Sequence, residues 1–151
     1  MSCIPLTSLQ KEYIIGFLLG DSCIERNGRN CRIRFDHSIK QLDYLRWKHH
    51  QLCPHSGKLT EYQVIDVRQK QPYKGCRFYT KTRECFNVYL QLFYPRKKKI
   101  VPQNISQLLT ARGLAVWFLD DGSRETRASA LFLILTATPW QRWSCYNKHC
   151  N

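Results

Sequence analysis

Two aspartates stand at the same place in two similar segments, and a pair of carboxylates held together can carry out metal-assisted chemistry. Asp21 is the eighth residue of segment 14–22, and Asp121 is the eighth residue of segment 114–122. A lone aspartate before Ser or Gly is usually a polar turn residue. The repetition in register instead favours one shared site that binds divalent metal ions. Such ions activate water and neutralise developing charge in phosphodiester hydrolysis, and Mg²⁺ suits oxygen ligands with retained waters.

The chain carries a large excess of positive charge. Lys and Arg number 24 and Asp and Glu number 11, which gives a formal net charge of +13. Such an excess repels itself unless an anionic partner relieves it. Nucleic acid is the usual partner because neutralising its phosphates releases condensed counterions. The alternative is a basic protein that has no such partner.

Local patterns place the first aspartate in an α+β unit. Capping-box spacing at Thr7 and Gln10 predicts a helix from Ser8 to about residue 21. Strands are expected at 23–26 and 31–35, joined by the hairpin signal Asn27-Gly28. Next come a helix over 42–52 and two strands, at 59–68 and 76–81, with a polar connection between them. A further helix ends near residue 94. The predicted order over residues 8–94 is α-β-β-α-β-β-α.

The apolar segments that end in the aspartates are expected to be helices packed against each other. Gly16 and Gly20 stand four residues apart on one face of the first helix, and small residues at that spacing let a second helix approach closely. Val116 and Asp120 occupy the matching places in the second helix. Asp120 is expected either at the frayed helix end or behind the metal ligands as a supporting carboxylate.

The two predicted hairpins concentrate basic residues. In strand 31–35 the apolar residues alternate with Arg32 and Arg34, which therefore share the open face. Arginine can read guanine in the major groove, and lysine mainly contacts phosphate. The residues expected to contact DNA are Arg26, Arg29, Arg32, Arg34, Arg68, Lys70, Lys74 and Arg77.

The segments IIGFLLGDS (14–22) and LAVWFLDDG (114–122) resemble the motif of the LAGLIDADG homing-endonuclease family. The sequence around these segments is similar to the flanks found in the single-chain, two-motif branch of the family, at residues 35–38, 44–45 and 99–102. The resemblance covers residues 6 to about 127. It implies an αββαββα repeat whose motif helices pack about a pseudo-two-fold axis, and saddle-shaped antiparallel sheets along the major groove. It also implies site-specific cleavage of double-stranded DNA, with Asp21 and Asp121 as catalytic ligands of Mg²⁺ or Mn²⁺.

The resemblance further implies basic or polar groups around the metal site. His37, Lys40 and Lys81, near the ends of predicted elements, are candidates, with solvated surface as the alternative. The His and Cys residues of segment 49–55 lack a second ligand pair at zinc-finger spacing. We therefore expect no metal in that segment.

The chain is expected to divide into a first repeat (1–94), a basic linker (95–105) and a partial second repeat (106–151). Residues 23–102 follow the first motif, whereas only residues 123–151 follow the second, and their last part does not resemble the family. The second repeat is therefore expected to be incomplete. A monomer is expected for a full-length form and a homodimer for this short form.

Two rival functions stay open at this stage. One is an RNA maturase on the same fold that binds its own intron RNA without cutting DNA, and the other is an inactive truncated remnant. Loss of either aspartate would abolish cleavage but spare a maturase. No apolar run approaches the ~20 residues of a membrane span, so no membrane partner is expected. The absence of a presequence fits synthesis inside an organelle, with the chloroplast expected and the mitochondrion as the alternative.

Overall fold

The computed structural model describes residues 4–66, 71–124 and 131–133. The helices and strands of this part are, in chain order, α1 (Ser8–Leu19), β1 (Cys23–Asn27), β2 (Asn30–Ser38), α2 (Leu42–Gln51), β3 (Thr60–Asp66), β4 (Gln71–Tyr79), α3 (Asn87–Phe93), α4 (Ile105–Leu108), α5 (Ala111–Asp121), β5 (Gly122–Arg124) and β6 (Leu131–Leu133). Short 3-10 turns, Ile39–Gln41 and Glu84–Phe86, precede α2 and α3.

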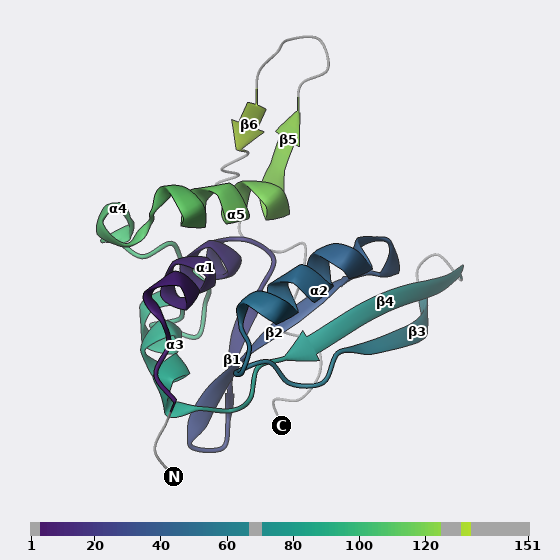
Figure 1. The fold of residues 1–151 in the computed structure, drawn as a ribbon, viewed down its shortest axis with the longest axis horizontal. Helices are drawn as coiled ribbons and strands as arrows, with labels where there is room; N and C mark the ends of the chain where they lie inside the picture. Colours follow the sequence, from purple (N-terminus) through teal and green to yellow (C-terminus); the bar gives the residue numbers. More distant parts are fainter. Residues whose placement is uncertain (1–3, 67–70, 125–130, 134–151) are drawn as a thin grey trace.

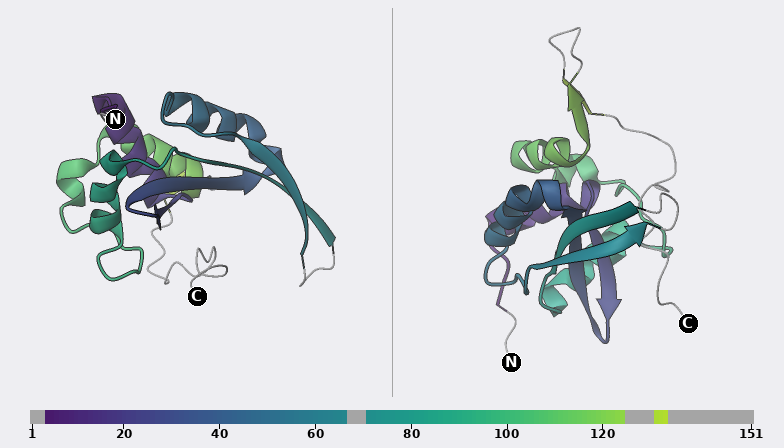
Figure 2. Two further views of the ribbon diagram at one scale, coloured as in Figure 1. Left: turned by 90° about the horizontal axis from the view of Figure 1, so that it is seen from below. Right: turned by 90° about the vertical axis from the view of Figure 1, so that its right-hand side faces the viewer.

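A four-stranded antiparallel sheet organises the first part of the chain (Figure 1). Its strand order is β1-β2-β4-β3, so the two predicted hairpins pair through β2 and β4. Helices α1 and α2 lie over one face of this sheet, and the β3–β4 hairpin curves away beyond them (Figure 2). The α+β class, the predicted element order and the antiparallel sheet are confirmed.

The alternation of β2 builds the core. Ile33 and Phe35 are fully buried beneath the helices. Phe35 stacks on Phe78 of β4 with ring centroids 4.5 Å apart, and Phe17 of α1 meets Phe35 edge-on at 5.3 Å. The helix that supplies Phe17 begins as its sequence predicts, because Thr7 and Gln10 form both hydrogen bonds of a capping box.

Two strands are longer than their sequence patterns predict. β2 runs on to Ser38 because His37 continues the alternation and is buried on the core face. β4 begins at Gln71, inside the segment expected to be a polar connection. Pro72 is accommodated there because β2 ends opposite Gly75, so only β3 borders β4 at this point.

The predicted linker falls largely in a segment without helix or strand, between α3 and α4. Of the predicted second repeat, the structure describes α4 and α5 and the short antiparallel pair β5–β6. The tail predicted not to resemble the family lies outside the described residues. Among the described helices, none has both the length and the apolar character needed to cross a membrane.

Candidate active site and nucleic-acid interface

Helices α1 and α5 make the close contact on which the site depends (Figure 1). A Cβ added at Gly16 would lie 2.4 Å from the backbone oxygen of Gly113 and 3.1 Å from Cβ of Val116. A Cβ added at Gly20 would lie 2.4 Å from Oδ2 of Asp120. Gly16, Gly20 and Val116 therefore lie in the helix contact, and the two helix ends are brought together.

Asp21 and Asp121 stand at these ends and act on each other electrostatically. Burial raises the pKa of Asp21 to about 6, and the negative charges of Asp120 and Asp121 add to the rise. Burial also raises the pKa of Asp121, although the indole N–H of Trp117, which donates to its Oδ2 at 3.0 Å, opposes the shift. The charges of Asp120 and Asp121 thus reach Asp21, and a divalent cation at the two helix ends would relieve this repulsion.

Lys99 brings positive charge to the same place. Its Nζ donates to the backbone oxygens of Gly20 at 2.7 Å and Ser22 at 2.9 Å. Burial lowers the pKa of Lys99 to about 8, although the charges of Asp121 and Asp21 favour its protonated form. This lysine lies in the segment predicted to be a linker (95–105), and it opens the flank 99–102 that carries part of the resemblance.

A buried ionic network lies directly behind the two aspartates. Lys48 of α2 donates to Oδ1 of Asp120 at 2.6 Å, and both side chains are 0% exposed. The phenol of Tyr44 donates to the same oxygen at 2.9 Å. Asp120 is therefore buried and hydrogen-bonded, not at a frayed helix end, and its role as a carboxylate behind metal ligands stays a prediction.

The candidate basic groups from the sequence fall in different places. His37 is buried, and its Nε2 lies 3.0 Å from Nζ of Lys48, so it belongs to the network behind the aspartates. Lys40 and Lys81 are exposed. The cations whose charges most affect the pKa of Asp21 are Lys48 and Lys99, so these two lysines replace Lys40 and Lys81 as the basic groups near the site.

Sequence reasoning missed Lys48 although a signal was present. It stands three residues after Leu45 and four before Leu52, both fully buried, so it lies on the apolar stripe of α2. The neighbouring His49 is only half-buried, and its Nε2 lies 2.8 Å from the backbone oxygen of Gly57. A lysine on a buried stripe needs a carboxylate partner, and that partner is remote in sequence.

The oxygen atoms at the helix ends fit a magnesium-type ion. Within the described residues, no group of three or more His, Cys, Asp or Glu side chains could hold a metal by themselves. Mg²⁺ commonly binds through one or two carboxylates, keeps several waters and takes further oxygens from substrate phosphates. Asp21 and Asp121 would supply that smaller set.

The open face of the sheet carries an ordered row of arginines. Arg32, Arg34 and Arg77 alternate with core residues on β2 and β4, so they point away from the helices. Arg77 is paired with Asp36 through an Nε–Oδ2 contact of 2.7 Å, and its guanidinium lies 4.7 Å from the ring centroid of Tyr62.

Arg32 is held in the same way. It is ion-paired with Glu25 at 2.6 Å and lies 4.1 Å from the ring centroid of Tyr79. These contacts fix the guanidinium planes, which reduces the entropy lost when the arginines bind a ligand.

The other predicted DNA contacts do not all share this face. Arg26 and Lys74 stand opposite Cys31 and Gln63, at register positions of the helix-covered side, and are exposed where the hairpins extend beyond the helices. Arg29 is exposed at the first turn. Strand alternation places Arg26 and Lys74 on the face opposite to Arg32, Arg34 and Arg77, and their predicted contact with DNA stays a prediction. Arg68 and Lys70 lie outside the described residues.

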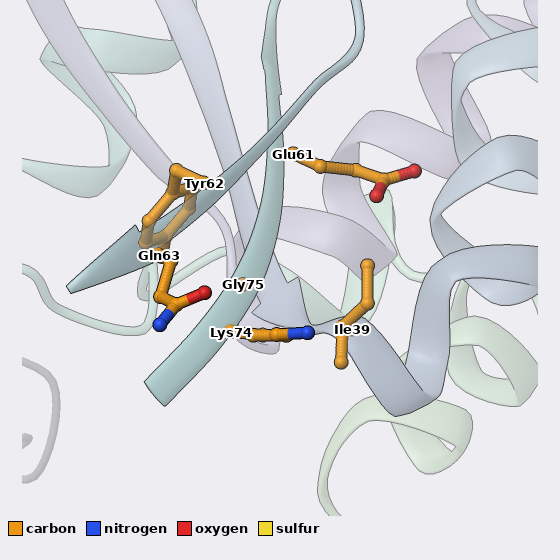
Figure 3. A pocket seen from close by; sticks show the side chains of 6 residues that line it. All are labelled: Ile39, Glu61, Tyr62, Gln63, Lys74 and Gly75. Carbon is orange, nitrogen blue, oxygen red and sulfur yellow. The ribbon is translucent and has the colours of Figure 1, made fainter. Parts of the chain in front are cut away.

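Lys74 borders a hollow of about 280 Å³ at the base of the second hairpin. Figure 3 shows Lys74 and Glu61 extending toward the side of Ile39, and Tyr62 on the other side of the strands. A carboxylate and a lysine together give this hollow no strong preference for a phosphate.

Comparisons with known proteins agree with this arrangement. The LAGLIDADG DNA endonuclease family matches residues 11–139. DNA endonuclease I-ChuI from Chlamydomonas applanata is 33% identical over 131 residues, which are 80% of this chain and 60% of that protein. Cytochrome b mRNA maturase bI2 from Debaryomyces hansenii is 29% identical over 125 residues, covering 80% of this chain and 48% of that protein.

The similarity extends to other proteins and to a solved structure. Protein RecA from Mycolicibacterium flavescens is 29% identical over 133 residues, 83% of this chain and 29% of that protein. The chain thus spans between 29% and 60% of the length of these curated relatives. The homing endonuclease I-WcaI bound to its DNA recognition sequence matches with a TM-score of 0.72 and 25% identity over 81% of this chain and 54% of that one. The chain belongs to the LAGLIDADG DNA endonuclease family.

Proposed function

We propose that this chain is a site-specific double-strand DNA endonuclease of the intron-homing type. The observation that carries the proposal is the placement of Asp21 and Asp121 at the ends of two closely packed helices. These ends lie beside a sheet whose open face carries oriented arginines. The relatives named as DNA endonucleases support the same function.

In this proposal Asp21 and Asp121 hold Mg²⁺, or Mn²⁺ in its place. When bound there, such an ion would supply an activated water and neutralise charge on the leaving oxygen. Lys99, held by the backbone oxygens of Gly20 and Ser22, adds a fixed positive charge that favours an anionic phosphate. Burial keeps both carboxylates and this lysine in a medium where their charges act strongly.

Double-stranded DNA is the proposed substrate and partner. Arg32, Arg34 and Arg77 face outward from one twisted sheet, and a two-stranded ribbon of this kind fits the major groove. Arg26 and Arg29 at the tip of the first hairpin would add phosphate contacts. A homodimer stays a prediction.

A maturase is the second candidate, because a cytochrome b mRNA maturase is among the relatives. Under this reading the basic sheet binds the chain's own intron RNA, and the aspartates have no reaction to catalyse. Expression in an organelle is part of either proposal, with the chloroplast as our choice and the mitochondrion as the alternative.

The test uses DNA that carries the intron-less insertion site. The purified chain is incubated with this DNA in Mg²⁺, in Mn²⁺ and in EDTA, and splicing of the intron RNA is measured in parallel. Double-strand cutting that needs the metal would support the endonuclease. Splicing without cutting by a folded, DNA-binding protein would overturn it in favour of the maturase, and failure of both would indicate an inactive remnant.

A further inference from the structure

A fully buried lysine joins α2 to the helix that carries the second aspartate. Lys48 and the side chain of Asp120 are each 0% exposed, and Nζ lies 2.6 Å from Oδ1. Removing both charges from water is costly, and an apolar pair of the same size is often as stable. A pair that is costly to bury suggests a role beyond holding the fold together.

The surroundings of the pair leave it little freedom. Nζ of Lys48 lies 3.0 Å from Nε2 of His37 and 4.5 Å from the ring centroid of Tyr44. Nε2 of His37 is placed to accept from the Lys48 ammonium, and its Nδ1 lies 3.2 Å from Oε1 of Gln41. Burial and the charge of Lys48 lower the pKa of His37, which favours its neutral form.

Asp120 uses both of its oxygens to connect separate elements. Oδ1 accepts from Lys48 and from the hydroxyl of Tyr44, both on α2. Oδ2 accepts from the backbone N–H of Asp21 at 3.4 Å. The carboxylate also fills the space that a side chain at Gly20 would need. One carboxylate, next in sequence to Asp121, therefore contacts both α2 and Asp21, the aspartate of the first motif.

We propose that Lys48, acting through Asp120, is a positioning residue that sets how far α5 is shifted and rotated against α1, so that Asp21 and Asp121 face one metal site. The proposal rests on the endonuclease function above. Glycine and valine contacts alone would allow the helices to slide. A slip would leave the buried charges of Lys48 and Asp120 without partners, which is strongly unfavourable. Lys48 itself does not touch substrate, because it is 0% exposed.

The deciding variant is the double substitution Lys48→Met/Asp120→Asn. It removes one positive and one negative charge, so the net charge near the metal site is unchanged, and both replacements preserve size. The matched control is Arg46→Met/Asp43→Asn, which makes the same changes at an exposed pair on the same helix. Thermal unfolding, DNA affinity in EDTA and single-turnover cleavage at saturating DNA in Mg²⁺ are compared.

We expect the double variant to fold and to bind DNA like the wild type, while its single-turnover rate falls by about tenfold or more, as for a small misplacement of reacting groups. The control should match the wild type in every measurement.

A merely structural pair would lower the unfolding temperature or the DNA affinity without this selective loss of rate. A double variant that cleaves at the wild-type rate would overturn the proposal. If the double variant does not fold, the single variant Lys48→Met decides, because it removes the ion pair with Asp120 and leaves the hydrogen bond from Tyr44 in place. A rate unchanged by Lys48→Met would then overturn the proposal.

A second readout does not depend on cleavage. Terbium(III) binds oxygen ligands, and its luminescence is sensitised by a nearby indole such as Trp117, which donates to Asp121. We expect a luminescence titration that Asp121→Asn abolishes and Lys48→Met/Asp120→Asn shifts to higher terbium concentration. If the wild type cuts no DNA but these shifts occur, the endonuclease proposal fails and the positioning role stands. If the wild type neither cuts nor binds terbium at Asp121, both proposals are overturned.

Discussion

The ionised form of Asp21 is disfavoured because it is buried and because the charges of other carboxylates act on it at the ends of α1 and α5. Its pKa is raised from 3.8 to about 6, first by burial and then by Asp120 and Asp121. The folded protein therefore holds this proton more tightly than the unfolded chain does. The stabilisation that results is full below pH 3.8 and is lost as the pH rises through about 6.

Asp21→Asn should therefore stabilise the metal-free protein at neutral pH. A difference between 3.8 and about 6 corresponds to about 3 kcal/mol, and solvent screening of this half-buried group reduces it. We expect the free energy of unfolding in EDTA to rise by about 1–2 kcal/mol at pH 7 and by less at pH 4.5. Urea denaturation at both pH values measures this, with the exposed Asp43→Asn as control. An equal gain at both pH values would contradict the assigned pKa.

The sequence indicates some of these residues and not others. Asp21 and Asp121 stand out because their segments repeat. Lys48 and Lys99 do not, because their importance comes from contacts with Asp120, Gly20 and Ser22 that are 72, 79 and 77 residues away along the chain. No local spacing encodes such contacts.

At the scale of elements, α1 and α5 can approach closely because the glycines in their contact have no side chain. Gly16 faces a backbone oxygen of α5 that cannot move aside like a side chain. Gly113 is less crowded, since its nearest neighbours, the backbone oxygen of Glu12 and Cδ1 of Leu109, would lie 3.2 Å from an added Cβ.

Gly16→Ala should consequently destabilise the protein more than Gly113→Ala. The helix propensity gained is the same for both, about 1 kcal/mol, whereas overpacking at Gly16 costs about 1–3 kcal/mol. Chemical denaturation gives the two free energies. We also expect Gly16→Ala to lower the cleavage rate more than the DNA affinity, because it pushes the two helix ends apart. Equal stability of the two variants would mean that the helices are not in close contact.

Element prediction succeeded where the pattern was strong and failed at strand ends. The capping box of α1 and the alternation of β2 were sufficient. The start of β4 was missed because Pro72 and Gly75 are typical of loops. Whether such residues can pair depends on which strand lies beside them, and here β3 alone borders Pro72.

At the scale of the whole molecule, the arginine face of the sheet is the expected DNA surface. Arg34 and Arg77 lie on it, whereas Arg46 is exposed on α2 over the opposite face. Arg34→Ala and Arg77→Ala should each weaken DNA binding by about 1–3 kcal/mol, and Arg77→Ala also leaves Asp36 unneutralised. Arg46→Ala should have little effect. Fluorescence anisotropy at two salt concentrations measures the affinities, and equal losses for all three arginines would contradict a specific face.

The two motif helices differ in how they are covered. Ile14 and Leu19 of α1 are 0% and 1% exposed in the core, whereas Leu114 and Leu119, at the same motif positions of α5, are 44% and 60% exposed in the described part of the chain. The sequence repeat predicts the helix pair but not this asymmetry, because cover depends on the strands that pack against each helix.

The central claim is that Asp21 and Asp121 form one metal site at the helix ends. Cleavage by the single variants Asp21→Asn and Asp121→Asn tests this claim most directly. Wild type, each variant and Asp43→Asn are compared in Mg²⁺ on DNA with the intron-less insertion site, after DNA binding is matched in EDTA. We predict that each site variant binds DNA but that its cleavage rate falls by about a hundredfold or more, while Asp43→Asn cuts like the wild type. Double-strand cutting at the wild-type rate by either site variant would contradict the account.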